Sequence, residues 1–403
     1  VEHQRLAGEQ RLHFIHLPVW PGYKAGALNE ALRCTHPLAQ WVAVVDADYV
    51  VSPQWLQRLG GWLEEPDVAV VQSPQAHRDG GRSRLARMMN WEYEGFFRLG
   101  MHHRHERNAI VQHGTMSLIR RQALESVGGW DAGCVCEDTE LGLRLLKAGW
   151  RNVYVDEVLG TGLVPQSFAA YQRQRQRWAR GGIQILRRHA ASLFGRSALS
   201  LGQRYHFVAG WLPWIGDTLH LVFTLTALAW SAGMLGIPEA FSLPSALMAL
   251  PLLVFFCSRL VMVPLLYGRR VSCSRLELWG AAWAGMALSH RIARGVLAGL
   301  WGGQATFHVT HKGIGVALLG NGSGATRPAP AWACTWQEGL LGGALLTTAL
   351  ALAWASLEPT GALWAWCAIL ALQALPYAAA VICAAMGASR LAGGGEVQVH
   401  DGA

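Results

Sequence analysis

The chain has 403 residues, of which 52% are apolar and only 15% are charged. Because soluble domains usually carry about 25% charged residues, this composition excludes a single soluble domain. Most charged residues precede roughly position 205 and long apolar stretches follow, so we expect a polar globular part and then a membrane part.

The net charge of +8 comes without the features of a nucleic-acid-binding protein. The sequence has no zinc-finger spacing, no RNA-binding aromatic signature and no basic helix with heptads, so nucleic acid is not an expected partner. The arginines are better suited to anionic lipid headgroups and phosphorylated substrates. The eight cysteines are scattered, which indicates neither a zinc site nor a disulfide framework.

The first half of the chain alternates short apolar runs with helical patterns. The runs at 41–45, 68–71 and 152–155 are typical of central strands covered on both faces. Helical periodicity lies between them at 55–63 and 141–146. This alternation predicts a layered α/β domain with a mainly parallel sheet.

The second half reads as membrane helices. Residues 168–189 are expected to form a basic amphipathic helix in the headgroup plane, with Ser167 as its N-cap. Four later stretches are long and apolar enough to span a bilayer; they are 206–235, 245–267, 337–357 and 361–386. A fifth stretch, 276–302, is interrupted by a histidine and two arginines, and we expect it to be an interfacial helix.

The loops indicate how the chain is oriented in the membrane. The loop at 268–275 holds three arginines, whereas those at 236–244 and 358–360 hold no lysine or arginine. By the positive-inside rule, the globular part and the C-terminus face the cytoplasm. We therefore expect four regions: a cytosolic catalytic domain at 1–165, interface helices at 166–204, a membrane domain at 205–387 and a cytoplasmic tail at 388–403.

Two pairs of acidic residues could carry chemistry. Asp46 and Asp48 follow the first apolar run, where the carboxyl end of a strand would present them to a ligand. They could hold Mg²⁺ or Mn²⁺ against a diphosphate, although the pattern alone also fits an ordinary turn. Glu137 and Asp138 open a helix. There a carboxylate could be a general base or merely compensate the helix dipole.

Two further motifs are basic. Gln174, Arg177 and Trp178 are spaced i, i+3 and i+4, so they share one helix face. An amide, a guanidinium and an indole together suit a diphosphate and a sugar, but a basic membrane-surface helix would look the same. Residues 307–312, Phe-His-Val-Thr-His-Lys, follow the expected interfacial helix and alone would read as a basic loop.

In this order, and followed by membrane spans, the motifs resemble the processive family 2 glycosyltransferases, which include cellulose, hyaluronan and chitin synthases. Residues 24–29 are similar to a K-x-G-A-L-N segment near the donor diphosphate, and 307–312 to the loop that covers the donor site. The segments 106–116, 203–207 and 210–214 most resemble bacterial periplasmic β-glucan synthases of the β-1,3 type.

The resemblance implies a GT-A-type fold and a set of site residues. The implied roles are as follows: Asp138 as base with Glu137 beside it; Lys24, Asp46, Asp48 and Arg177 at the nucleotide and diphosphate, with Asp46 and Asp48 also on the metal; His113, Gly114, Gln174 and Trp178 at the acceptor; and Phe307, Val309, Thr310 and Lys312 in a gating loop at 305–313. Cys136 stands where the family usually has threonine. The early strand that contacts the nucleoside is missing, which suggests a truncation before Val1.

The expected reaction is inverting, processive transfer of glucose from UDP-glucose to a growing β-glucan, with coupled export through the inner membrane of a bacterium. The resemblance allows for accessory export subunits and leaves the linkage open. Two alternatives also stay open. One is a hyaluronan- or chitin-type synthase that uses UDP-N-acetylglucosamine. The other is a non-catalytic membrane scaffold or transporter, for which Asp217 is the candidate intramembrane acid.

Overall fold

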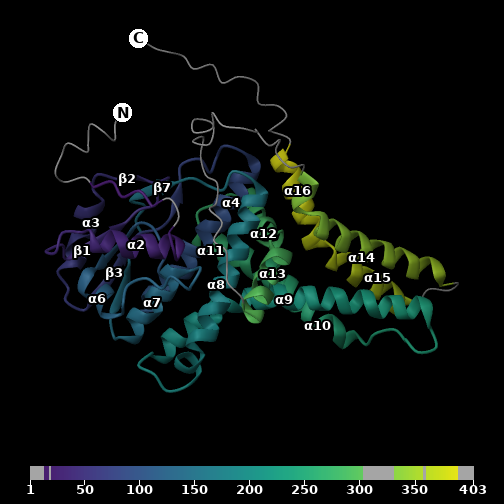
Figure 1. The fold of residues 1–403 in the computed structure, drawn as a ribbon. Coiled ribbons are helices and arrows are strands. Elements are labelled where there is room, and N and C mark those ends of the chain that lie inside the picture. Colours follow the sequence, from purple (N-terminus) through teal and green to yellow (C-terminus); the bar gives the residue numbers. More distant parts are fainter. Residues whose placement is uncertain (1–12, 18–19, 303–330, 357–359, 389–403) are drawn as a thin grey trace, which may run out of the picture.

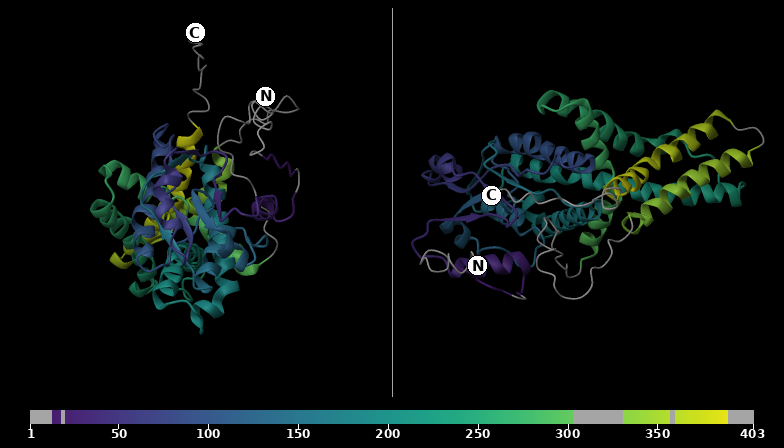
Figure 2. Two further views of the ribbon diagram at one scale, coloured as in Figure 1. Left: turned by 90° about the vertical axis from the view of Figure 1, so that its left-hand side faces the viewer. Right: turned by 90° about the horizontal axis from the view of Figure 1, so that it is seen from above.

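A computed structural model of the chain describes residues 13–17, 20–302, 331–356 and 360–388. An α/β part built on strands lies at one end, and a group of long helices extends away from it as an arm (Figure 1). Seen from above, the helices of the arm diverge from their junction with the α/β part (Figure 2). The expected globular part followed by a helical part is therefore present.

The main sheet has four strands in the order β1 (Trp41–Val44), β5 (Ser117–Arg120), β3 (Val68–Gln72) and β6 (Arg151–Tyr154). Strands β3 and β6 are parallel, but β5 is antiparallel to both of its neighbours. The three strands expected from sequence thus run in one direction, with a reversed strand between two of them. The expected α/β class is confirmed; the sheet is mixed in detail, with three of its four strands in one direction and β5 reversed.

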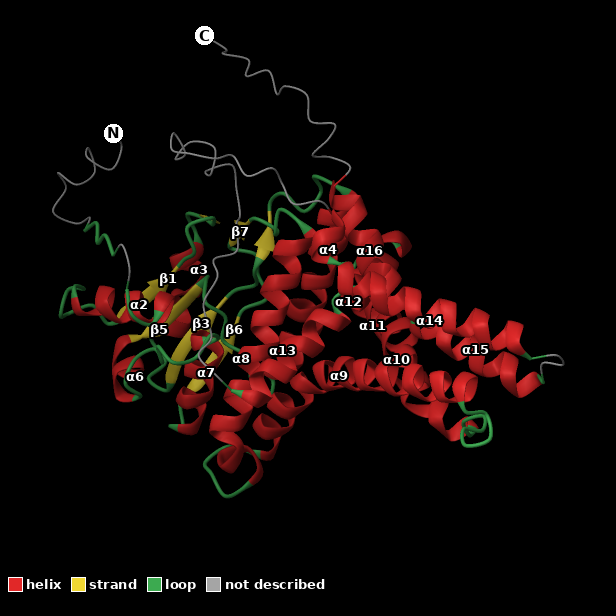
Figure 3. Cartoon of the chain, turned by 45° about the vertical axis from the view of Figure 1, so that its right-hand side comes forward, coloured by secondary structure: helices red, strands yellow, loops and turns green. Residues whose placement is uncertain are grey.

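Strand β3 explains why the sheet is the centre of the domain. All five of its residues are buried. Val70 packs toward helices α2 (Tyr23–Arg33) and α7 (Glu137–Lys147), and Val71 packs on the other face toward α3 (Trp55–Leu63). A strand that is covered on both faces reads as a continuous apolar run, which is how the sequence revealed it. Figure 3 shows helices on both sides of the strands.

A small second sheet joins segments near the carboxyl end of β1. Its order is β2 (Val50–Val51), β7 (Gly160–Gly162) and β4 (Ala76–His77). Strand β7 is antiparallel to β2 and parallel to β4. Because β2 begins two residues after Asp48, this sheet fixes the chain that follows the first acidic pair.

Helix α8 (Phe168–Phe194) connects the α/β part to the arm. As predicted, Ser167 is its N-cap, and the serine side chain accepts a hydrogen bond from the amide of Ala170. Helix α13 (Ser289–Trp301) lies against α8. A side chain at Gly295 would collide with the backbone carbonyl of Gln176, so the absence of one lets the two helices approach closely.

Four helices in the described residues are long and apolar enough to cross a membrane, in agreement with the sequence expectation. They are Leu201–Gly236, Leu247–Arg270, Trp336–Ala355 and Gly361–Gly387. The first of these is α9, which begins with a capping box formed by Ser200 and Gln203. The second is divided into η2 (Ala246–Ala249), α10 (Leu250–Cys257), η3 (Ser258–Met262) and α11 (Val263–Arg270). The third is α14 (Trp336–Ala355) and the fourth comprises α15 (Gly361–Gln373) and α16 (Leu375–Ala388).

The stretch at 276–302 is two helices and not the single helix expected. Helix α12 (Arg275–Met286) ends before Ala287, and α13 begins at Ser289. The remaining helices of the described residues are α4 (Arg84–Gly95), η1 (Phe96–Met101), α5 (His102–His105), α6 (Arg121–Ser126) and η5 (Ala331–Cys334). The expected gating loop at 305–313 and the tail at 388–403 lie outside the described residues, save Ala388 itself.

Candidate active site

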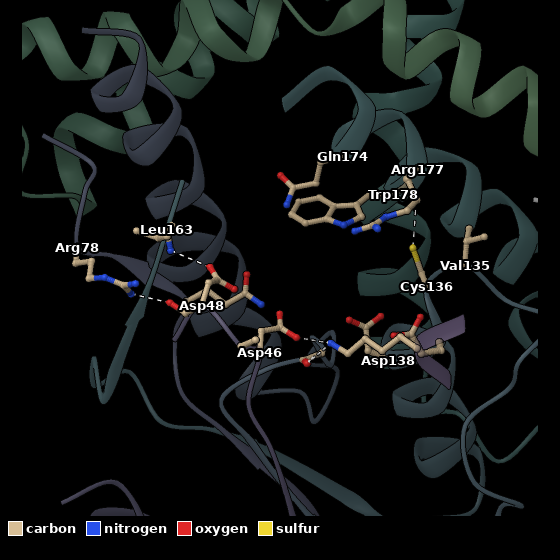
Figure 4. A pocket seen from close by; sticks show the side chains of 15 residues that line it. Asp46, Asp48, Arg78, Val135, Cys136, Asp138, Leu163, Gln174, Arg177 and Trp178 are labelled. Carbon is tan, nitrogen blue, oxygen red and sulfur yellow. Dashed lines mark hydrogen bonds and ion pairs between the residues drawn. The ribbon is translucent and has the colours of Figure 1, made fainter. Parts of the chain in front are cut away.

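A cleft of about 610 Å³ lies at the carboxyl end of β1, between the sheet and α8. Both acidic pairs and the basic helix motif line it. The predicted residues found there are Lys24, Asp46, Asp48, Gly114, Glu137, Asp138, Gln174, Arg177 and Trp178. Figure 4 shows Asp46 and Asp48 on one side, Asp138 across from them and the α8 side chains above. Five segments that are distant in sequence therefore meet at one place.

Lys24 links the two acidic pairs. Its Nζ lies 2.6 Å from Asp46 Oδ1 and donates to the carbonyl oxygen of Gly114 at 2.7 Å. Burial alone would lower the pKa of Lys24, but the nearby carboxylates, first Asp46 and then Asp138, outweigh it and raise that pKa. The ammonium is therefore charged at neutral pH and partly balances the acidic side chains of the cleft.

Backbone groups hold Asp48 in place. Its Oδ2 accepts a hydrogen bond from the amide of Leu163 at 3.0 Å. Arg78 donates to the carbonyl oxygen of Asp48 at 2.7 Å and to that of Thr161 at 2.6 Å. Arg78 lines the cleft and was not predicted, because it belongs to none of the motifs.

Glu137 and Asp138 occupy the first turn of α7. Burial raises the pKa of Asp138, an effect that the charges of Lys24 and Arg177 partly offset. For Glu137, burial and then the charge of Asp138 raise the pKa to about 7. A Cβ atom on Gly114 would lie 3.0 Å from both Asp138 Oδ2 and Lys24 Nζ, so this glycine leaves room for their approach.

Cys136 is the N-cap of α7, and its side chain makes no capping hydrogen bond. Its Sγ lies 4.0 Å from the carbonyl oxygen of Trp178. Burial raises the pKa of the Cys136 thiol well above its usual value, so the thiol is neutral. The departure noted in the sequence thus removes a cap but leaves Glu137 and Asp138 facing the cleft.

The α8 residues lie on one face, as their helical spacing predicts. Gln174 accepts a hydrogen bond from the hydroxyl of Tyr93, and the ring of Trp178 is edge-to-face with that tyrosine at 5.8 Å. Arg175 was not predicted as a site residue. Its guanidinium carbon lies 4.6 Å from the centre of the Trp178 ring, and it forms an ion pair with Glu92 on α4. The pair holds an arginine beneath the indole.

A second cavity of about 430 Å³ adjoins the cleft. The two share Gln75, Cys136, Asp138 and Trp178. Its walls are rich in aromatic rings, contributed by α4, η1, α8 and α9; they are Tyr93, Phe96, Phe97, Trp178, Phe207, Trp211 and Trp214. It therefore continues the cleft toward the helical arm.

His113 lines this second cavity and is absent from the cleft lining. Its Nδ1 lies 3.0 Å from the carbonyl oxygen of Thr115, which fixes the proton on Nδ1. Its Nε2 is buried with no hydrogen-bond partner in the described part of the chain. Burial lowers the pKa of His113 to about 4, so the ring is neutral and Nε2 is an acceptor.

The cleft is suited to a divalent cation only if a ligand completes the coordination. The described residues contain no group of three or more His, Cys, Asp or Glu side chains placed to hold a metal. Asp46 and Asp48 supply oxygen atoms, the donor type that Mg²⁺ and Mn²⁺ prefer. Magnesium is commonly bound by one or two carboxylates together with substrate phosphates and water, and this pair fits that arrangement.

Residues 3–181 match the family described as "Glycosyltransferase like family 2". This part of the chain is therefore similar to the family 2 glycosyltransferases. This match confirms the expected fold class, an α/β glycosyltransferase domain followed by a helical region with four candidate membrane helices.

Curated relatives carry names of polysaccharide synthases. The chain is 30% identical over 190 residues to "Probable glucomannan 4-beta-mannosyltransferase 1" of Arabidopsis thaliana. The aligned region covers 46% of this chain and 34% of that protein. The chain is 30% identical over 235 residues to "Cellulose synthase 1" of Komagataeibacter xylinus, covering 57% of this chain and 15% of that protein. The chain therefore spans about a third or less of the length of either relative.

This chain is also similar to a solved structure. It is "Mannosyltransferase PcManGT from Pyrobaculum calidifontis in complex with GDP-Man and Mn2+", which is 19% identical, with a TM-score of 0.46 over 74% of this chain and 73% of that one. The expected kinship with cellulose-synthase-like enzymes is thus supported by curated relatives. The closer likeness to β-1,3-type synthases stays a prediction.

Proposed function

We propose that this protein transfers glucose from UDP-glucose to the end of a growing β-glucan, with inversion at the anomeric carbon and export of the polymer. The observation that carries the proposal is the single cleft in which two acidic pairs, Lys24 and the α8 motif meet. The family 2 domain supports glycosyl transfer, and the polysaccharide-synthase relatives support a polymeric product. We place the protein in a bacterial inner membrane with the cleft in the cytoplasm.

Asp138 is the proposed general base. It takes the proton of an acceptor hydroxyl as that oxygen attacks the anomeric carbon. The bond from this carbon to the diphosphate oxygen breaks on the opposite face, and UDP leaves with the electron pair. Asp138 must be ionised to act, and the charges of Lys24 and Arg177 favour its ionised form.

Cations in the cleft would stabilise the departing diphosphate. Arg177 can bind phosphate oxygens in a bidentate manner, and Lys24 adds a second positive charge. Asp46 and Asp48 would hold Mg²⁺ or Mn²⁺, which when bound neutralises negative charge on the leaving nucleotide. These side chains converge from separate elements, so the donor would be oriented before the reaction begins.

The second cavity is the proposed acceptor path. Its aromatic rings offer flat apolar surfaces for sugar rings, and Trp178 belongs to both the cleft and this cavity. The Nε2 of His113, which has no partner among the described residues, can accept a hydrogen bond from a sugar hydroxyl. Because the cavity reaches residues of α9, a growing chain would pass from the cleft toward the membrane helices.

The test uses the full-length protein in membranes with Mg²⁺ and one labelled donor at a time: UDP-glucose, UDP-N-acetylglucosamine or GDP-mannose. We expect polymeric label from UDP-glucose, and digestion with linkage-specific glucanases identifies the bond. Asp138→Asn should lower incorporation by at least 10³-fold, because the amide cannot accept the proton. If only one of the other two donors is incorporated, that donor and not UDP-glucose is the substrate. If no donor is incorporated by folded protein, the scaffold alternative stands.

A further inference from the structure

Residues 131–140, which comprise the segment before α7 and the first turn of that helix, are attached to the C-terminal half of α8 by contacts outside the cleft. We call this set the α7–α8 clamp; its polar groups are the Asp131 and Glu140 side chains and the backbone amide of Val135 on one side, and the side chains of Gln184, Arg188 and His189 on the other. Arg188 forms an ion pair with Asp131 and donates to the carbonyl oxygen of Gly133 at 2.9 Å. Of these clamp residues, only Val135 is among those that line the cleft.

The buried centre of the clamp is the contact between Glu140 and His189. The Glu140 side chain is only 3% exposed, and its Oε1 lies 2.9 Å from His189 Nε2. Lys147 Nζ lies 3.3 Å from His189 Nδ1. Because an ammonium can only donate, Nδ1 is the acceptor and the Nε2–H of the histidine donates to Glu140. Arg144 Nε, at 2.7 Å, balances the charge of the carboxylate.

The backbone of α8 also approaches this segment closely. A Cβ atom on Gly181 would collide with the side chains of Cys136 and Val135. Glycine is therefore required if the helix is to lie directly against the residues that precede Glu137. The clamp thus combines a buried hydrogen bond, an ion pair and a close backbone contact.

These contacts fix α7 relative to α8. Asp138 lies two residues before Glu140 on α7, while Arg177 and Trp178 lie on α8 ahead of His189. We infer that the clamp sets the position of Asp138 opposite Arg177 and Trp178, and that His189 is a positioning residue for the transfer reaction. The inference rests on the proposed function, because it assigns Asp138 the role of base.

His189→Leu tests this in the full-length protein in membranes. The leucine removes the donor to Glu140, and a misplacement of about 1 Å can cost on the order of 10²-fold in rate. We expect kcat to fall about 10- to 100-fold while the KM for UDP-glucose stays within about twofold. His189→Gln, whose amide can donate to Glu140, should recover most of the rate. His103→Leu, at an exposed position, is the matched control.

A second measurement does not depend on activity. Hydrogen exchange of the amides at 131–140, followed by mass spectrometry, should be faster in His189→Leu than in the parent or in His103→Leu. Gly181→Ala, which disturbs the other contact of the clamp, should show the same two effects. The inference is overturned if kcat is unchanged in an active His189→Leu protein, or if hydrogen exchange at 131–140 is unchanged in that variant. An inactive parent with the predicted exchange pattern would instead refute the proposed function alone.

Discussion

The α/β part and the helical arm treat buried charge in different ways. In the cleft, Lys24, Asp46, Glu137 and Asp138 face a common open space, so their charges are available to a ligand. In the arm, Asp217 of α9 is fully buried and is bound by Arg259 of η3 at 2.7 and 2.8 Å. The charged residues of the cleft are therefore placed to bind a ligand, whereas the buried pair of the arm holds two helical segments together.

The comparison bears on the transporter alternative. Coupled transporters use intramembrane acidic residues that can bind and release an ion. Asp217 instead has both carboxylate oxygens bound by one guanidinium. The ion pair therefore supports a structural role for Asp217, and the chemistry is expected in the cleft.

The largest effect after loss of the base is expected at Lys24. Lys24→Met removes the cation from both acidic pairs, and we expect kcat/KM to fall by about 10²-fold. The acidic limb of the pH–rate profile should also move to higher pH, because the remaining Asp138 carboxylate loses a charge that favours its ionised form. Steady-state rates between pH 5 and 9 measure both kcat/KM and the position of the acidic limb. Arg58→Met removes an exposed cation and should change neither kcat/KM nor the profile. An unshifted profile in Lys24→Met would contradict the effect of the Lys24 charge on the ionisation of Asp138.

Breaking the arm's ion pair should affect stability first. Arg259→Met leaves the buried Asp217 carboxylate without its partner, and we expect a loss of about 3 kcal/mol. Thermal unfolding in detergent measures it. The double variant Asp217→Leu with Arg259→Met should be more stable than the single variant, since no buried charge remains. A single variant as stable as the parent would show that water or another group supports Asp217.

Glu137 gives a smaller, pH-dependent effect. Its pKa rises from 4.5 to about 7 on folding, so the folded state holds the proton more tightly than the unfolded chain. The stability that this proton confers is present below pH 4.5 and is lost as pH rises through about 7. Glu137→Gln should therefore flatten the decline of the unfolding temperature between those two values. An equally steep decline in the variant would place its cause in other groups.

The smallest effect is expected on the outer surface of the arm. Trp354 of α14 is 91% exposed in the described chain, as a side chain facing lipid would be. Trp354→Phe keeps an apolar ring, and we expect transfer activity and unfolding temperature to stay close to those of the parent. A loss of more than about threefold would point to a protein partner on this face instead of lipid.

Local sequence patterns were sufficient for much of the fold. The run at 68–71 predicted β3 because the strand is buried on both faces, and hydropathy predicted the four long helices. Strand β5 was missed because its Ser-Leu-Ile-Arg sequence is short and has polar ends. That one strand, inserted between β1 and β3, makes the sheet mixed. Strand direction depends on contacts across the sheet, which no local pattern encodes.

The same distinction applies to the site. Asp138 and Arg177 were predicted because their neighbours form motifs with fixed spacing. Arg175 was passed over since its importance depends on Glu92, which lies on a separate helix. His189 carried no signal at all, because its partner Glu140 is recognised only when α7 and α8 are side by side. Contacts between distant elements are therefore what the structure adds.

The position of Lys24 has a consequence for the order of events. This ammonium sits between the side that would receive the nucleotide and the carboxylate that would take the proton. An arriving diphosphate would compete for its positive charge, and the proton affinity of Asp138 would rise as a result. By reciprocity, a protonated Asp138 would bind the anionic nucleotide more tightly. A bound nucleotide would thus make the ionised Asp138 a stronger base, and it would also enlarge the protonated, inactive fraction at low pH.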